Sequence, residues 1–216
     1  MTTTQQMKFR YVELFLLFVV LPFFLAIPIP LSVRLGVVAL GLVYVVILFL
    51  KHKLIVFQFS SDVDWGSFAK YTMLKFIVIA LITTFSVYYF QPNLLFCVPM
   101  HKPVLFVVIL LVYTFLSVWP QEVLYRTFFF KRYEALFKNK RVLIFTNALL
   151  FCLAHLFFRN ALVLLLTFIG GLLFAYTYIK TRSTLLVTIE HSIYGNWLFT
   201  VGMGEMLAFP GQEPCV

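Results

Sequence analysis

The stretch Trp119-Pro120-Gln121-Glu122-Val123-Leu124-Tyr125-Arg126 places a carboxylate and a guanidinium four residues apart in an otherwise apolar part of the chain. Residues four apart on an α-helix lie on the same face, so both charges would point to one side of one helix. Ionisable side chains inside a membrane cost roughly 2.5–3.5 kcal/mol each, and they usually face a protein interior or a wet cavity. The stretch therefore indicates a helical membrane protein with a functional site at Glu122 and Arg126.

The composition of the whole chain supports a membrane protein. Of the 216 residues, 62% are hydrophobic and 12% are charged, and the mean hydropathy is +0.99. Apolar runs of about 20 residues are long enough to cross a hydrocarbon core of about 30 Å as helices. We predict an all-α, polytopic transmembrane helical bundle of about seven spans, at residues 11–27, 31–50, 70–90, 104–130, 141–158, 161–179 and 184–201.

The distribution of Lys and Arg predicts the orientation of these spans. With the N-terminus in the cytoplasm, the inner segments hold twelve of the 17 basic residues and the outer segments hold three, while Lys75 and Arg126 lie within spans. This asymmetry follows the positive-inside rule, so we predict a cytoplasmic N-terminus and an external C-terminus in the plasma (inner) membrane of a prokaryote. Because the net charge of +9 is scattered between apolar runs, the predicted partner is the lipid bilayer and not nucleic acid.

Local signals predict how two of the helices begin or bend. Residues 59–65 read as an interfacial turn in which a Ser or Asp, such as Asp62 or Asp64, caps the next helix. Pro120 predicts a kink, because proline removes a backbone donor and biases residue 119 away from helix. The three cysteines show no metal-binding spacing, and a pairing of Cys97 with Cys215 requires both to lie outside.

Two histidines in other spans accompany the charged pair. His155 lies near the end of the fifth predicted span and His191 lies in the seventh. At 1.5 Å per residue, Glu122, His155 and His191 lie roughly 14, 21 and 12 Å from the inner ends of their helices. All three side chains can therefore share one level in the membrane.

Two imidazoles and a carboxylate at one depth suit a divalent ion, most readily zinc, with an open position for water. Such an ion lowers the pKa of bound water toward about 7, and a nearby carboxylate takes the proton. The predicted ligands are His155, His191 and Glu122, and the implied reaction is peptide-bond hydrolysis within the bilayer. Arg126 would orient Glu122 or bind a substrate carboxylate.

Each of these residues also has a structural interpretation. A membrane histidine can simply be an interhelical hydrogen-bonding group. Glu122 and Arg126 can be an ion pair that stabilises a break in their helix. Glu190 can be a second-shell partner of a histidine or can face a wet cleft.

The ordered motifs resemble a known family. Gln121-Glu122-x-x-x-Arg126, Phe151-x-x-x-His155 and His191 followed by Asn196 are similar to the CAAX-processing and bacteriocin-processing family (CPBP, Abi, Rce1-like) of intramembrane metalloendopeptidases. The resemblance covers about residues 104–204, the last four spans, which would form the family core with the active site. Residues 1–103 would then be N-terminal transmembrane helices of unknown role, and residues 205–216 a short C-terminal tail.

The family pattern is Glu-Glu-x-x-x-Arg, then Phe-x-x-x-His, then His-x-x-x-Asn or Asp. The resemblance implies that the glutamates and histidines bind or activate a metal-bound water and that the final amide completes the site. This chain departs at Gln121, which cannot act as a base at neutral pH, so Glu122 would take over. It departs again at Gly195, four residues after His191. Asn196 comes one residue later, about 140° around the helix, and it would join the site only through a distortion such as a π-bulge.

The sequence thus predicts a metal-dependent intramembrane endopeptidase that hydrolyses a membrane-associated protein or peptide. Two alternatives from other classes remain open. One is a catalytically impaired family member that serves as a membrane scaffold or immunity-type protein. The other is a proton or ion relay transporter. The predicted catalytic residues are Gln121, Glu122, Arg126, His155, His191 and Asn196.

Overall fold

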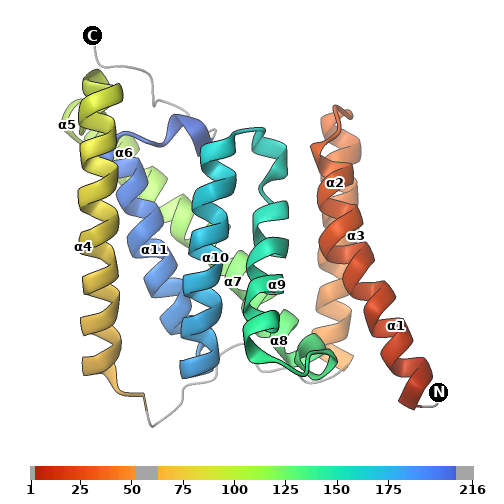
Figure 1. Ribbon diagram of the computed structural model, residues 1–216. Helices are drawn as coiled ribbons and strands as arrows, with labels where there is room; N and C mark the ends of the chain where they lie inside the picture. Colours follow the sequence, from red (N-terminus) through yellow and green to blue (C-terminus); the bar gives the residue numbers. More distant parts are fainter. Residues whose placement is uncertain (1–2, 52–62, 208–216) are drawn as a thin grey trace. The chain divides into compact units, whose positions relative to one another are not determined.

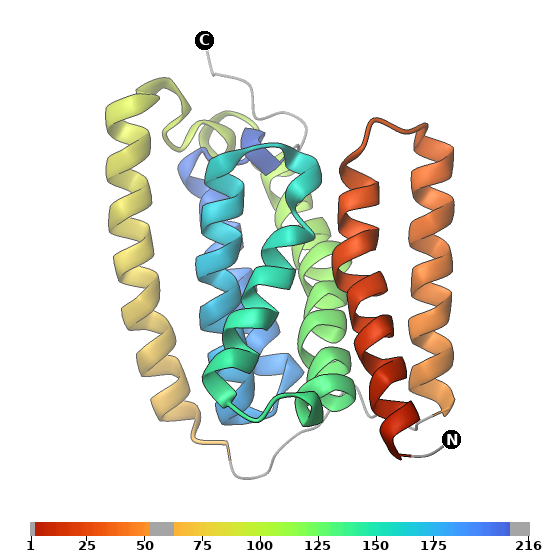
Figure 2. The ribbon, with the colours of Figure 1, turned by 45° about the vertical axis from the view of Figure 1, so that its right-hand side comes forward.

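The structure is a computed structural model that describes residues 3–51 and 63–207 (Figure 1). The described residues form helices joined by short turns, and they contain no β-strand. The predicted all-α class is therefore confirmed. Figures 1 and 2 show the helices from two directions.

Six helical runs among the described residues are long and apolar enough to cross a membrane: Thr4–Ala26, Ser32–Lys51, Trp65–Phe90, Pro103–Leu136, Lys140–Phe158 and Ala161–Thr181. They fall at the first six predicted spans, and the protein is an integral, multi-pass membrane protein. The seventh predicted span forms the helix α11 (Thr184–Val201) of 18 residues. This helix carries Glu190, His191 and Asn196, and its crossing of the membrane stays a prediction.

The chain divides into two compact units, each built from two separate segments. Unit 1 combines Met1–Gln58 with Glu122–Thr184, and unit 2 combines Phe59–Gln121 with Leu185–Val216. Each unit is therefore described by itself. Both contain helices from the predicted N-terminal range and from the predicted family core.

Unit 1 begins with a continuous helical run made of α1 (Thr3–Phe15), η1 (Leu16–Val20) and α2 (Leu21–Ala26), followed by α3 (Leu31–Lys51). Its second segment contains η4 (Val123–Phe128), α8 (Phe129–Tyr133), η5 (Glu134–Leu136), α9 (Lys140–Leu153), η6 (Leu156–Phe158) and α10 (Ala161–Thr181). Asparagines begin the last two long helices, because the side-chain oxygens of Asn139 and Asn160 accept backbone N–H groups of the first turn. Figures 1 and 2 both show α9 and α10 side by side.

A buried carboxylate joins the first two spans of unit 1 to α8. Both oxygens of Glu13 accept hydrogen bonds from Arg132, at 2.9 and 2.8 Å. Tyr133 and Tyr44 donate to the same carboxylate at 2.6 and 2.9 Å. The ring of Phe18, in η1, packs edge-on against three aromatic rings of η4 and α8, namely Tyr125, Phe129 and Tyr133. A single charge in an apolar run is thus paired and hydrogen-bonded, as a buried charge requires.

Unit 2 contains α4 (Trp65–Phe90), η2 (Pro92–Leu94), α5 (Cys97–His101), α6 (Pro103–Val112), η3 (Tyr113–Val118), the first three residues of α7 (Trp119–Glu122), α11 and η7 (Glu205–Leu207). One side of α6 and η3 packs with α11 in a core of Val98, Ile109, Tyr113, Val118 and Phe199. Cys97 is disulfide-bonded and Cys152, in unit 1, is a free thiol. Cys215 lies outside the described residues.

The predicted cap of α4 is confirmed for Asp64. Its carboxylate accepts the backbone N–H of Ser67 at 2.9 Å. Hydrogen bonds from the side chain and backbone of Ser67 hold the pKa of Asp64 below its usual value. Asp62 lies outside the described residues.

Prolines in two spans follow π-helical turns. The π-helix η3 ends at Val118, two residues before Pro120, and η1 ends at Val20, two residues before Pro22. A proline cannot donate a hydrogen bond and clashes with the preceding α-helical turn, and a wider π-helical turn relieves that crowding. Trp119 keeps helical angles (φ −58°, ψ −48°), so the predicted bias away from helix at residue 119 is wrong.

Candidate active site

The six residues predicted to be catalytic lie in two groups, one on each unit. Glu122, Arg126 and His155 belong to unit 1. The other three, Gln121, His191 and Asn196, belong to unit 2. Each group is therefore described within its own unit.

In unit 1, the predicted charged pair is a buried ion pair. The side chains of Glu122 and Arg126 are both 0% exposed, and Arg126 Nε lies 3.3 Å from Glu122 Oε2. Arg126 lies within the π-helix η4, which starts directly after Glu122. π-Helical turns often occur at functional sites. The pair places a desolvated carboxylate beside a fixed positive partner.

The guanidinium of Arg126 has further partners on α9 and α10. Its Nη1 donates to Asn147 Oδ1 at 2.8 Å, and Asn147 Nδ2 donates to the carbonyl of Tyr125 at 2.8 Å. The rings of Phe151 and Phe174 lie 4.9 and 5.8 Å from Arg126 Cζ, within the range of cation–π attraction. These contacts fix the guanidinium, and through it the carboxylate of Glu122.

Asn147 was not among the residues predicted from the sequence. A signal was present, because Asn147, Phe151 and His155 follow one another at intervals of four residues in α9 and the turn after it. An asparagine within an apolar helix also needs several hydrogen-bond partners. Because Asn147 is four residues before Phe151, the two side chains lie on the same face of the helix.

The Phe-x-x-x-His motif has a direct structural meaning. His155 follows the end of α9, with φ −98° and ψ 5°, and its Nδ1 lies 2.8 Å from the carbonyl oxygen of Phe151. A carbonyl can only accept, so Nδ1 carries the proton and donates it. In the neutral ring Nε2 is then the acceptor nitrogen, which is the usual arrangement of a metal-ligating or base histidine.

In unit 2, the π-helix η3 supplies a hydrogen-bond partner for each predicted site residue. Tyr113 Oη lies 3.2 Å from His191 Nε2. Asn196 Nδ2 donates to Thr114 Oγ1 at 3.1 Å, and Gln121 Nε2 donates to Ser117 Oγ at 2.9 Å.

Both amides of this group are oriented with their nitrogen toward a hydroxyl of η3. Among the described residues, the buried oxygens Gln121 Oε1 and Asn196 Oδ1 have no hydrogen-bond partner. Each amide therefore presents a buried acceptor. Tyr113, Thr114 and Ser117 were not predicted from the sequence, because their importance depends on contacts with other segments.

The π-bulge that Asn196 would need in order to join the face of His191 is not present. The helix α11 is α-helical from Thr184 to Val201, so Asn196 stays on a different face from His191. The phenol of Tyr113 fills the space beside Gly195. Asn196 reaches η3 without a π-bulge.

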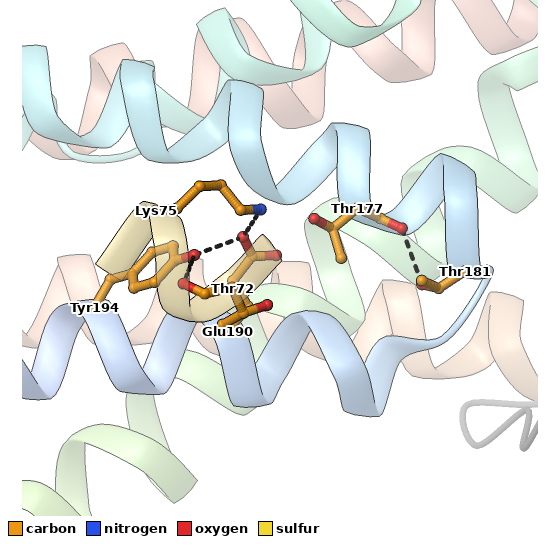
Figure 3. A network of polar contacts seen from close by, with 6 residues as sticks. All are labelled: Thr72, Lys75, Thr177, Thr181, Glu190 and Tyr194. Atoms are coloured by element: carbon orange, nitrogen blue, oxygen red, sulfur yellow. Dashed lines mark hydrogen bonds and ion pairs between the residues drawn. The ribbon is translucent and has the colours of Figure 1, made fainter. Parts of the chain in front are cut away.

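Glu190 pairs with a lysine, and not with a histidine or a wet cleft as considered from the sequence. Its Oε1 forms an ion pair with Lys75 of α4, and the hydroxyl of Tyr194 contacts that same oxygen at 3.0 Å (Figure 3). Tyr194 Oη also lies 3.1 Å from the carbonyl oxygen of Thr72. Glu190 thus joins α11 to α4 within unit 2.

The donor groups fit the predicted metal site to different degrees. His155 has the orientation of a ligand, whereas Nε2 of His191 already contacts a phenol. Among the described residues, no three His, Cys, Asp or Glu side chains form a cluster that could hold a metal ion. The ligand set His155, His191 and Glu122 stays a prediction.

Comparison with known protein families gives one match. The family model described as "Type II CAAX prenyl endopeptidase Rce1-like" matches residues 103–197. This part of the chain is similar to the Rce1-like family. Neither the curated proteins nor the solved structures that were compared with the chain gave a match.

The match agrees with the resemblance seen in the ordered motifs. The Rce1-like stretch contains the Glu122–Arg126 ion pair, the Phe151–His155 contact and His191. The match suggests an intramembrane endopeptidase of the CAAX-protease type.

Proposed function

We propose that this chain is a metal-dependent intramembrane endopeptidase that cleaves a peptide bond near the end of a membrane-anchored, prenylated protein or peptide. The observation that carries the proposal is the buried Glu122–Arg126 pair inside the Rce1-like stretch. A fully desolvated carboxylate is costly unless it is paired, and such groups within spans commonly mark function. The name of the matching family supports the prenylated substrate class.

Glu122 serves as the general base in this proposal. It takes a proton from water as the water oxygen bonds to the scissile carbonyl carbon, and it returns the proton to the amine as the carbon–nitrogen bond breaks. Arg126 orients the carboxylate through their ion pair. Gln121 and Asn196 act as hydrogen-bonding groups, since neither amide can take up a proton at neutral pH.

A divalent ion, most readily zinc, would be held by His155, His191 and Glu122. Its chemistry would be to acidify bound water and to polarise the scissile carbonyl. Support comes from the ligand-type orientation of His155 and from the predicted common depth of the three side chains.

The experiment uses the full chain, purified and placed in lipid nanodiscs with zinc. A fluorogenic peptide with a farnesylated carboxyl-terminal cysteine motif is compared with its unprenylated twin. We expect cleavage of the prenylated peptide, loss of cleavage in Glu122→Gln and His155→Ala, and little change in His101→Ala. His101 is a matched control, because its Nδ1 also contacts the carbonyl four residues before it, that of Cys97. No cleavage of either peptide by the wild type, together with normal processing in cells that carry His155→Ala, would overturn the proposal.

A second candidate is a non-catalytic scaffold or immunity-type member. One observation favours it, namely the amide at Gln121, which stands where the family pattern has a glutamate and is tied to Ser117. The substitution Gln121→Glu separates the two functions. Cleavage by the wild type supports the enzyme, whereas cleavage only by Gln121→Glu supports the scaffold.

A further inference from the structure

The first helical run of unit 1, made of α1, η1 and α2, lies outside the stretch that matches the Rce1-like family. Within its π-helix η1, Phe18 is buried at 1% exposure, whereas Leu16 and Val20 are exposed. The ring of Phe18 meets that of Tyr125 edge-on, with centroids 5.2 Å apart. A residue of the first helical run therefore packs against the direct neighbour of Arg126 in the sequence.

The ring contacts continue from Tyr125 to the candidate site. Tyr125 meets Phe151 edge-on at 5.2 Å between ring centroids, and Phe151 meets the imidazole of His155 at 4.8 Å. Tyr125 and Phe151 are both buried. The rings of Phe18, Tyr125 and Phe151 thus form a buried aromatic column that ends on His155.

The last ring of the aromatic column touches two candidate site residues. The guanidinium carbon of Arg126 lies 4.9 Å from the centre of the Phe151 ring. The carbonyl oxygen of Phe151 accepts the hydrogen bond from His155 Nδ1 at 2.8 Å. Because protein interiors are close-packed, a gap left at Phe18 is transmitted to the rings that lean on it. A shift of Phe151 would move Arg126 and His155 together.

The first helical run also holds the chain on the other side of His155. The helix α2 packs against η6, the 3-10 turn that follows His155. Arg159 donates from Nη2 to the carbonyl of Ala26, at 2.9 Å, and it keeps a left-handed backbone with φ 52°. A non-glycine residue adopts that conformation at an energetic cost. The first helical run therefore supports the segment four residues before His155, at Phe151, and four residues after it, at Arg159.

We infer that the first helical run is part of the active site and that Phe18 is a positioning residue for His155. Phe18 acts through the rings of Tyr125 and Phe151, and the Phe151 ring also fixes the guanidinium of Arg126. The catalytic consequence of this inference rests on the proposed endopeptidase function. A misplacement of about 1 Å caused by a distant substitution can lower a rate about 100-fold.

The kinetic expectation follows from which groups move. We expect Phe18→Ala to lower kcat for the prenylated peptide about tenfold or more and to change KM little, because the groups that it displaces act in the chemical step. Phe18→Leu keeps most of the buried volume, so it should stay folded and show a smaller loss of kcat.

The decisive measurement is nuclear magnetic resonance of the full chain, labelled with ¹³C-histidine, in nanodiscs. An adjacent aromatic ring shifts the resonances of imidazole protons, so the His155 signals report its position against Phe151. His155→Gln assigns these signals. We expect Phe18→Leu to shift them and Phe18→Ala to shift them further, while the signals of His101, in unit 2, stay unchanged.

Phe15→Ala is the matched control. It removes a phenylalanine ring from the same helical run, but Phe15 is 55% exposed. We expect it to leave the His155 signals and kcat unchanged. Unchanged His155 signals in folded Phe18→Leu and Phe18→Ala, or an equal change in Phe15→Ala, would overturn the inference.

This measurement does not depend on catalysis. If the wild type cleaves no peptide but the His155 signals respond to Phe18→Leu and not to Phe15→Ala, the proposed function fails and the positioning by Phe18 stands. If the wild type cleaves the prenylated peptide and the His155 signals are the same in all folded variants, the inference fails alone.

Discussion

Arg126 Nε lies 3.3 Å from Glu122 Oε2 in an ion pair whose side chains are both fully buried. The side chains of Asn147, Phe151 and Phe174 contact the guanidinium of Arg126 in unit 1, and Asn147 also donates to the carbonyl of Tyr125. Burying a charged pair costs solvation, so evolution toward stability alone would favour apolar residues of similar volume. The pair is therefore better explained by chemistry than by packing.

A double-mutant cycle should show how strongly this pair is coupled. We expect Arg126→Met and Glu122→Gln each to lower the free energy of unfolding by about 3 kcal/mol, because each leaves a buried partner without its counter-charge. The double variant should lose clearly less than the sum, since it leaves no unpaired charge. Reversible unfolding in mixed micelles with added sodium dodecyl sulfate measures all three. Strictly additive losses would show that the two side chains act independently.

The Glu13–Arg132 pair should contribute much more than the Glu134–Arg182 pair. Glu13 is buried and accepts two hydrogen bonds from Arg132, whereas Glu134 and Arg182 are 33% and 46% exposed at their side chains. We expect Glu13→Gln to lower the free energy of unfolding by about 3 kcal/mol. The matched control Glu134→Gln should cost less than about 1 kcal/mol, because water screens an exposed pair. Equal losses in the same unfolding assay would contradict this.

Two neighbouring glycines of α10 should respond differently to alanine. A Cβ at Gly171 would lie 2.9 Å from the backbone Cα of Ala148 on α9, whereas one at Gly170 would meet only the ring edge of Phe174, at 3.1 Å. Close backbone approach through small residues is a common way for membrane helices to pack. We expect Gly171→Ala to lower the unfolding midpoint and Gly170→Ala to leave it nearly unchanged, as measured by circular dichroism on heating. A greater effect at Gly170 would refute this account of the packing.

The ion pair between Lys75 and Glu190 should hold α4 in unit 2. Lys75→Met would leave the buried Glu190 carboxylate without its cation, and we expect a loss of about 3 kcal/mol in the free energy of unfolding. Lys70→Met is the matched control on the same helix, because Lys70 is exposed. Faster proteolysis next to α4 in Lys75→Met, but not in Lys70→Met, would localise the effect. Similar behaviour of both variants would exclude a stabilising pair.

Metal removal tests the cofactor prediction directly. We expect chelation to abolish cleavage of the prenylated peptide and added zinc to restore it, since zinc acidifies its bound water. Elemental analysis should find less metal in the His155→Ala, His191→Ala double variant than in the wild type or in His101→Ala. Full activity in chelator with no bound metal would show that hydrolysis proceeds without the ion.

The sequence by itself determined the fold class and the residues worth testing. Apolar runs of about 20 residues leave the backbone no option in lipid except helix, so the spans follow from length and composition alone. The charges of Glu122 and Arg126 were conspicuous for the same reason. Their spacing of four predicted their pairing, because it depends only on local helix geometry.

Only the tertiary structure decided which partners these groups have. Asn147 binds Arg126 from 21 residues away, and Tyr113 contacts His191 from 78 residues away. Such contacts arise from the packing of separate helices, which the periodicity of one helix does not encode. Gly195 shows the difference most clearly. In the sequence, a glycine stands where the family pattern has Asn or Asp. In the structure, the phenol of Tyr113, from another helix, fills the space beside this glycine.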